Sequence, residues 1–207
     1  EIWNTDVNAI LETKTPPESI MMPKVQTPDE VVILDELLSD SGHDTLIHVI
    51  IETNEALEAA FEIAHSSSRI ESLFFGGIDM AAELRCKNDW DQLLYARSRV
   101  VHAAASARLD VIDVPYLDLE DIEGMSVLAK QAKELGFCGK GAIHPKQIPT
   151  LNEIFTPSEK EIKRAREVIK TFEQADTGLV VIDGKLIEKP VMREMYRIAT
   201  IAKKLGK

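Results

Sequence analysis

Carboxylate side chains follow two of the most apolar runs of this sequence. Glu52 comes directly after residues 46–51, Leu-Ile-His-Val-Ile-Ile, and Asp79 follows Leu-Phe-Phe after a short Gly-Gly-Ile segment. In a parallel α/β fold, the carboxyl ends of neighbouring strands lie about 4.8 Å apart at the edge that carries the site. Glu52 and Asp79 could therefore share a hard cation such as Mg²⁺, with water and substrate oxygens as the other ligands. The alternative is that each carboxylate only caps the helix that follows it.

Four further side chains are candidates either for a chemical role or for an ordinary structural one. His144 stands at the end of a predicted strand, before Pro145, whereas the other four histidines have no partner at metal-ligand spacing. Arg97 and Arg99 share a predicted helix, where one is expected in a buried ion pair and the other in solvent. Glu188 follows a predicted hairpin, and its simplest interpretation is a solvated carboxylate.

The elements that must position these residues alternate between short apolar runs and helical patterns. The expected strands are residues 19–22, 46–51, 73–75, 110–113 and 140–143. Each run is too short for a helix, and most are rich in β-branched or aromatic residues, as buried parallel strands are. Their spacing of about 25 to 38 residues is that of a βα unit. The fold class is therefore α/β, either an open doubly wound sheet or a (β/α)8 barrel.

Helix signals fill the intervals between these runs. Residues 27–30 are Thr-Pro-Asp-Glu and residues 156–159 are Thr-Pro-Ser-Glu. Both have the pattern of a capping box with Pro at the first helical position. The segment after Thr53 and residues 93–107 carry apolar stripes with the helical period, and residues 122–135 end at Gly136. No GxGxxG or P-loop pattern follows a strand, so a nucleotide-binding loop is not indicated.

The composition narrows the classes of partner. The 207 residues include 24 Lys and Arg and 35 Asp and Glu, a formal charge of −11. This acidic balance argues against nucleic acid and against an anionic membrane as main partners. Cys86 and Cys138 lie 52 positions apart and form no zinc motif. No signal-peptide or membrane-spanning pattern occurs, so a cytoplasmic protein is expected.

The last quarter of the chain departs from the βα rhythm. Residues 159–174 predict a charged helix, residues 178–188 a hairpin turning at Asp183–Gly184, and residues 191–205 an amphipathic helix. The expected domains are a partial barrel over residues 1–155 and an appendage of helix, hairpin and helix over residues 156–207.

Several motifs occur in an order and at distances typical of one family. They are MPKV (22–25), IET (51–53), FGGID (75–79), YARSRVV (95–101), AIHPKQ (142–147), FTPSEKE (155–161) and DGKLIE (183–188). From about residue 19 onward, the chain resembles the citrate lyase beta-subunit-like family. That group includes malyl-CoA and citramalyl-CoA lyases and belongs to an aldolase superfamily with a (β/α)8 TIM barrel.

The resemblance assigns a cofactor and a substrate contact. It implies that Glu52 and Asp79 bind Mg²⁺, and that the backbone at Gly77 and Ile78 faces the carboxylate of a 2-oxo acid. In this interpretation the carboxylates do more than cap helices.

The resemblance also implies a thioester site that two subunits share. Ile143, His144 and Pro145 are candidates for CoA contact, and Glu188 for the catalytic acid/base. The family usually has Asp at the position of Glu188, so the carboxyl group here stands on a side chain one methylene longer. A homotrimer or larger ring is implied, in which the appendage covers the neighbouring subunit's site.

The function expected is a Mg²⁺-dependent carbon–carbon lyase that cleaves a citramalyl-CoA or malyl-CoA type thioester to acetyl-CoA and a 2-oxo acid. One alternative is a citrate lyase beta subunit acting on a citryl thioester of an acyl carrier protein. A thioesterase variant and a catalytically silent assembly or binding homologue are two others.

The count of strands falls short of a closed barrel. Five strands are expected where a barrel of this kind has eight. Residues 1–18 are interpreted as the helix before the barrel's fourth strand. An opening motif of the type RS-x-LFVPG and an RxN-type arginine motif do not occur. The N-terminal part of the barrel, three units or about 80 residues, is therefore expected to be missing from this sequence.

Overall fold

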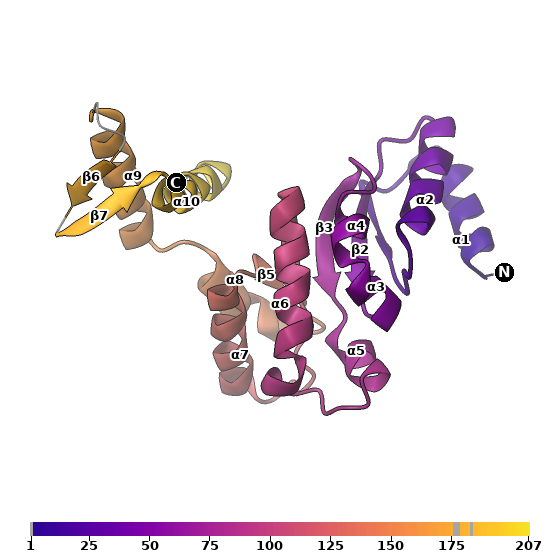
Figure 1. Cartoon of the computed structure of the whole chain (residues 1–207). Coiled ribbons are helices and arrows are strands. Elements are labelled where there is room, and N and C mark those ends of the chain that lie inside the picture. Colours follow the sequence, from indigo (N-terminus) through magenta and orange to yellow (C-terminus); the bar gives the residue numbers. More distant parts are fainter. Residues whose placement is uncertain (1, 176–178, 183) are drawn as a thin grey trace. The chain divides into compact units, whose positions relative to one another are not determined.

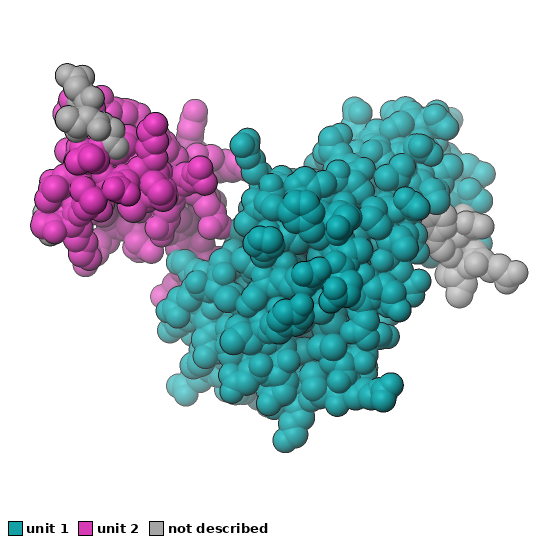
Figure 2. Space-filling model, viewed as in Figure 1, with its two compact units in different colours: residues 1–151 teal, residues 152–207 magenta. Residues whose placement is uncertain are grey.

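The chain forms two compact units. The computed structural model describes residues 2–175, 179–182 and 184–207. Residues 1–151 make up the first unit and residues 152–207 the second, as Figure 2 shows in two colours. Helix α8 (Ile148–Phe155) crosses this division, which lies four residues before the boundary expected from the sequence.

The first unit is built on one parallel sheet of five strands (Figure 1). The strands follow chain order: β1 (Ser19–Met22), β2 (Leu46–Ile51), β3 (Ile70–Phe75), β4 (Asp110–Asp113) and β5 (Gly139–Lys140). The helices between them are α2 (Pro28–Asp40), α3 (Asn54–Glu58), α4 (Ala60–Ala64), α5 (Gly77–Glu83), α6 (Trp90–Ala107) and α7 (Ile122–Leu135), with α1 (Ile2–Leu11) before β1. The predicted α/β class and the five strands are confirmed.

The two faces of this sheet are covered to different extents. On one face Ile47, Val49 and Ile51 of β2 are completely buried, and helix α6 packs against β3 and β4. On the other face the paired residues Met21 and His48 are only partly covered, and the Met21 side chain is 51% exposed. Burial in this unit therefore comes mainly from the helix-covered face.

Two local predictions are wrong. The sequence predicts the last strand over residues 140–143, but β5 ends at Lys140 because the N–H of Ile143 donates to Gln147 Oε1 instead of to a strand. The second capping box is predicted at residues 156–159. The N–H of Thr156 still donates to Asn152 O, so it belongs to the end of α8. The box forms two residues later, between Ser158 and Glu161.

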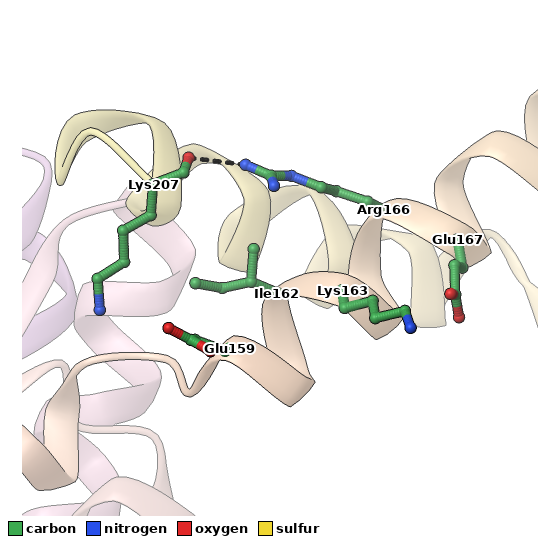
Figure 3. A pocket seen from close by; sticks show the side chains of 6 residues that line it. All are labelled: Glu159, Ile162, Lys163, Arg166, Glu167 and Lys207. Atoms are coloured by element: carbon green, nitrogen blue, oxygen red, sulfur yellow. Dashed lines mark hydrogen bonds between the residues drawn. The ribbon is translucent and has the colours of Figure 1, made fainter.

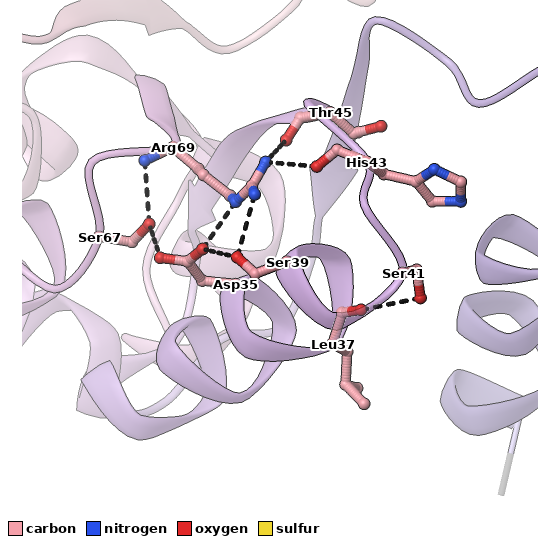
Figure 4. A network of polar contacts seen from close by, with 8 residues as sticks. All are labelled: Asp35, Leu37, Ser39, Ser41, His43, Thr45, Ser67 and Arg69. Atoms are coloured by element: carbon pink, nitrogen blue, oxygen red, sulfur yellow. Dashed lines mark hydrogen bonds and ion pairs between the residues drawn. The ribbon is translucent and has the colours of Figure 1, made fainter.

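A polar network fixes the sheet edge opposite the carboxyl ends of the strands (Figure 4). Arg69, just before β3, donates from Nε to Asp35 Oδ1 of α2 at 2.6 Å. Its Nη1 group donates to the carbonyls of His43 and Thr45 at 2.8 and 3.2 Å. Ser67 Oγ donates to the second oxygen of Asp35 at 2.7 Å. One ion pair thus joins α2 to the segments that enter β2 and β3.

The second unit contains a hairpin between two helices. These elements are α9 (Glu159–Glu173), β6 (Leu179–Ile182), β7 (Lys185–Glu188) and α10 (Lys189–Lys204). The strands pair antiparallel, and Val168, Ile187 and Met192 form a small core. This is the predicted order of elements. Gly178 and Asp183 of the predicted hairpin lie outside the described residues.

Among the helices of the described residues, none combines the length and the apolar character that crossing a membrane requires.

Candidate metal centre and active site

Glu52 leaves the end of β2 almost completely buried, with 6% of its surface exposed. Gly76 at the end of β3 leaves the room for it. A Cβ on Gly76 would overlap the Glu52 side chain and lie 2.6 Å from Oε2, so only glycine fits beside this carboxylate. The N–H of Gly76 donates to Ile51 O, which fixes the two strand ends to each other.

Asp79 stands in the first turn of α5, and its side chain is about half exposed. The alternative in which both carboxylates cap helices does not hold in the structure. Thr53 caps α3 by accepting from the N–H of Ala56 at 3.1 Å, and Gly76 occupies the N-cap of α5. Glu52 and Asp79 are therefore left for another partner.

That partner is Lys24, for which the sequence pattern predicts no role. Its backbone N–H donates to Glu52 Oε1 at 3.0 Å. Its ammonium group forms a hydrogen-bonded ion pair with Asp79 Oδ1 and lies 3.8 Å from Glu52 Oε1. Lys24 adopts a left-handed backbone conformation with φ 57°, which is uncommon for a residue with a Cβ. The MPKV motif directly after β1 was the available signal, because a strand end beside β2 must lie near Glu52.

The electrostatics of this cluster follow from two carboxylates beside one cation. Burial raises the pKa of Glu52, and the charge of Asp79 raises it further, while Lys24 opposes both effects. The hydrogen bond from Lys24 lowers the pKa of Asp79, and the same bond raises the pKa of Lys24. The cluster thus favours a positive charge next to both carboxylates.

This donor set fits a hard divalent cation. Two carboxylates from adjacent strand ends already hold one cationic group, and Mg²⁺ commonly takes one or two protein carboxylates with water and substrate oxygens as further ligands. Within the described part of the chain, no group of three or more His, Cys, Asp or Glu could hold a metal. The protein ligands available at this point are therefore Glu52 and Asp79.

Gly77 and Ile78 lie beside the carboxylate pair, in the same turn as Asp79. Gly77 is buried, and a Cβ there would meet the ring of Phe75 at 2.9 Å and Val114 at 3.1 Å. Ile78 is 43% exposed. Because α5 begins at Gly77, the N–H groups of both residues have no preceding helical carbonyl to bind.

The loop after β5 carries the three residues predicted to contact CoA. Ile143 and Pro145 are exposed, and His144 Nδ1 accepts from the N–H of Lys146 at 3.1 Å. Gln147, completely buried, donates to Tyr116 O at 2.8 Å and anchors the loop. This loop leaves the same sheet edge as Glu52, two strands beyond the Gly77–Asp79 turn.

Asp113, the third carboxylate at a strand end, is not available as a ligand. It is completely buried between Arg97 Nε at 3.0 Å and Lys140 Nζ at 2.6 Å. The Arg97 guanidinium also lies 4.9 Å from the centres of the Phe75 and Trp90 rings. Burial lowers the pKa of Lys140, although Asp113 opposes that shift. The buried ion pair expected for one of the two helix arginines is confirmed at Arg97.

Glu188 belongs to the second unit. It is the last residue of β7 and the N-cap of α10, and it is exposed. Its side chain makes no capping hydrogen bond. The structure therefore brings Glu52, Asp79, Gly77 and Ile78 together, and leaves the predicted catalytic carboxylate in solvent on a separate unit.

Comparison with known proteins finds relatives over most of this chain. The citrate lyase subunit beta of Leuconostoc mesenteroides subsp. cremoris is 29% identical and covers 97% of this chain and 70% of its own length. The mitochondrial citramalyl-CoA lyase of Rattus norvegicus is 29% identical, with 95% and 64% covered. The chain thus spans about two thirds of the length of these relatives.

A solved structure resembles the fold as well. The CitE protein of Mycobacterium tuberculosis in complex with magnesium and pyruvate superposes with a TM-score of 0.62 and 26% identity, covering 75% of this chain and 64% of that one. The model of the family described as HpcH/HpaI aldolase/citrate lyase matches residues 1–145. With most of its length inside that match, the chain belongs to the HpcH/HpaI aldolase/citrate lyase family.

Proposed function

We propose that the protein is a Mg²⁺-dependent carbon–carbon lyase that cleaves a citramalyl-CoA or malyl-CoA type thioester to acetyl-CoA and a 2-oxo acid. The observation that carries this proposal is the Glu52–Asp79 pair. At adjacent strand ends these two carboxylates already hold one positive charge, the ammonium group of Lys24. The name of the citramalyl-CoA lyase relative supports the reaction class. The complex of the CitE protein with magnesium and pyruvate supports the metal and the 2-oxo acid.

We further propose that the five strands belong to a (β/α)8 barrel. The half-covered sheet face around Met21 and His48 supports this, because a closed barrel buries the inner face of its strands. The active site then lies at the carboxyl ends of the strands, where Glu52 and Asp79 stand.

The residues of the chain divide the work of the reaction. Glu52 and Asp79 would hold the Mg²⁺, which would supply Lewis-acid polarisation of the substrate hydroxyl and carboxylate oxygens. Lys24 would exchange its bond to Asp79 for one to an anionic substrate group, because Asp79 cannot bind a metal and keep this ion pair through the same oxygen. The N–H groups of Gly77 and Ile78 face the 2-oxo acid carboxylate in this proposal.

Glu188 provides the proton step. The hydroxyl passes its proton to a water molecule as the carbonyl of the 2-oxo acid forms. The adjacent C–C bond breaks, and its electron pair passes to the acetyl thioester carbon. Glu188 donates a proton to that carbon, giving acetyl-CoA. An exposed carboxyl that makes no capping bond is suited to act on a neighbouring subunit. We therefore propose a homotrimer or larger assembly. We also propose that the protein is cytoplasmic and that Ile143, His144 and Pro145 contact CoA.

Replacement of the buried ligand tests the proposal. Glu52→Gln keeps the shape of the side chain but removes its charge, so we expect Mg²⁺ affinity to fall by about tenfold or more and 2-oxo acid release to fall with it. Titration calorimetry with Mg²⁺ and a coupled assay for pyruvate or glyoxylate measure the two effects. Glu55→Gln, exposed in the first turn of α3, is the matched control. Unchanged metal binding and unchanged cleavage in Glu52→Gln contradict the assignment.

A second candidate is a citrate lyase beta subunit that acts on a citryl thioester of an acyl carrier protein. The Leuconostoc relative, which aligns with 97% of this chain, favours it. Turnover of free CoA thioesters supports the first function, whereas turnover only of carrier-bound thioester supports the second. Hydrolysis of the thioester would indicate the thioesterase variant, and lack of any turnover the silent homologue.

A further inference from the structure

The second unit carries a concentration of positive charge that the proposed function leaves without a role. Lys160, Lys163 and Arg164 lie three and four residues apart on α9, so they share one face of that helix. Lys185 of β7 joins them around a surface pocket of about 470 Å³. Glu167 is the one carboxylate among the described residues that line this pocket.

Figure 3 shows a second pocket, which adjoins the first because Lys163 and Glu167 line both. It has a volume of about 440 Å³. Arg166 and Lys207 add two more cationic side chains, and the Arg166 guanidinium donates to Lys207 O at 2.7 Å. Within the part of the chain that the structure describes, the two pockets together are lined by six Lys and Arg side chains and by two carboxylates, those of Glu159 and Glu167.

The lysine charges of this surface are not neutralised within the described residues. Lys160, Lys163 and Lys185 form no ion pair or side-chain hydrogen bond in the part of the chain that the structure describes, whereas Lys24, Lys140 and Lys146 of the first unit each form one. Like charges converging on one pocket repel each other, and a bound anion relieves that repulsion. The contrast with a chain of formal charge −11 makes the cluster a local feature rather than a consequence of composition.

We propose that this α9 surface, lined by Lys160, Lys163, Arg164, Arg166 and Lys185, binds the phosphate groups of a small phosphorylated ligand. Concave pockets lined by ammonium and guanidinium groups match a compact anion with several oxygens. An acidic protein surface is the competing ligand, but it would need an extended basic face rather than two hollows. The source of the phosphates is either the CoA thioester, which rests on the proposed function, or a separate nucleotide or inorganic phosphate, which does not.

The test compares two variants with the same change of charge. Lys160→Gln/Lys163→Gln/Lys185→Gln removes three amines of the pocket, and Lys170→Gln/Lys203→Gln/Lys204→Gln removes three amines of the same unit outside both pockets. Binding of pyrophosphate, ADP, CoA and 3′-dephospho-CoA is measured by calorimetry at low and physiological salt. We expect the pocket variant to bind at least one of these about tenfold more weakly and the control variant to stay within about twofold of the parent.

The outcomes of this experiment distinguish the two sources of the phosphate groups, and they distinguish failure of the anion site from failure of the lyase proposal. CoA binding clearly tighter than dephospho-CoA and pyrophosphate assigns the site to the substrate, while equal binding of pyrophosphate and ADP assigns it to a separate phosphorylated ligand. Absence of binding to the parent protein, or an equal loss in both variants, overturns the proposal, as does lysine-dependent binding of an acidic protein alone. Because Glu52→Gln leaves this surface intact, pyrophosphate binding in that variant distinguishes failure of the lyase proposal from failure of the anion site.

Discussion

Several basic side chains of the first unit pair with carboxylates, whereas Lys160, Lys163 and Lys185 around the α9 pockets of the second unit have no partner among the residues that the structure describes. Residues 1–151 contain 12 Lys and Arg and 26 Asp and Glu. The basic side chains near its strand ends, Lys24, Lys140 and Arg97 of α6, each bind a specific carboxylate. Residues 152–207 contain 12 basic and 9 acidic residues, and Lys160 and Lys163 line pockets without partners in the described structure. Paired charges position groups, whereas unpaired charges remain available to a ligand.

The difference follows from how each unit is built. In the first unit, parallel strands bring side chains from segments far apart in sequence to one edge, and burial there demands that charges be paired. In the second unit, the charged helix α9 packs a narrow apolar stripe on α10 and on the hairpin, and leaves most of its surface in water. Preorganised chemistry is therefore expected at the strand ends, and recognition of soluble anions on α9.

The largest expected effect is on the buried triad of Arg97, Asp113 and Lys140. Arg97→Met removes one partner of a completely buried carboxylate, so we expect the free energy of unfolding to fall by about 3–5 kcal/mol. Urea denaturation measures it. Lys163→Met on the α9 surface is the matched replacement in the second unit and is expected to change stability by about 0.5 kcal/mol or less. Equal losses in the two variants would break the distinction between paired and unpaired charge.

The arrangement of strands and carboxylates was predictable from the sequence, and the finer contacts were not. Glu52 and Asp79 each follow a short apolar run that the sequence predicts to be a strand. These two strands are consecutive in the chain and adjacent in the sheet, so their carboxyl ends lie together. Lys24 was missed because its role depends on a left-handed backbone turn and on the direction of a flexible side chain, neither of which a pattern of residue types specifies.

The two wrong local predictions have a similar origin. Thr156 and Ser158 both have an acidic residue three positions on, and only the packing of α8 decides which one caps α9. Residues 141–143 look like a strand, but the buried Gln147 side chain binds the N–H of Ile143 and ends the pairing. In both places a hydrogen bond between a side chain and the backbone sets the boundary: Ser158 accepts from the N–H of Glu161, and Gln147 accepts from the N–H of Ile143.

An intermediate effect is expected at Lys24, whose ammonium group pairs with the metal-site carboxylates. Lys24→Met removes the ammonium group but keeps the backbone N–H that binds Glu52 Oε1. Two carboxylates then face each other without a neutralising charge, so we expect Mg²⁺ to bind about tenfold more tightly than in the parent. Calorimetric titration measures this, with Lys146→Met, which loses only an exposed contact to Glu120, as the control. Weaker Mg²⁺ binding would mean that Lys24 supports the site instead of competing for it.

The smallest effect is expected where a paired charge lies near the surface. Burial opposes ionisation of Asp35, but hydrogen bonds from Ser67, Arg69 and Ser39 outweigh it and lower its pKa. A carboxyl group whose pKa is lower in the folded state adds stability above its unfolded pKa of about 3.9, and that stability is lost as the pH falls through the folded pKa.

Asp35→Asn should therefore lower the free energy of unfolding by about 1–2 kcal/mol at pH 7, and the deficit should shrink as the pH falls below about 4. Denaturation curves at several pH values measure the difference, with the exposed Asp40→Asn on the same helix as a control that changes little at any pH. A deficit that stays constant from pH 7 to pH 3 would show that the Asp35 network stabilises the sheet edge by shape and not by charge. The pairing of charges would then matter only where burial is complete, as at Asp113.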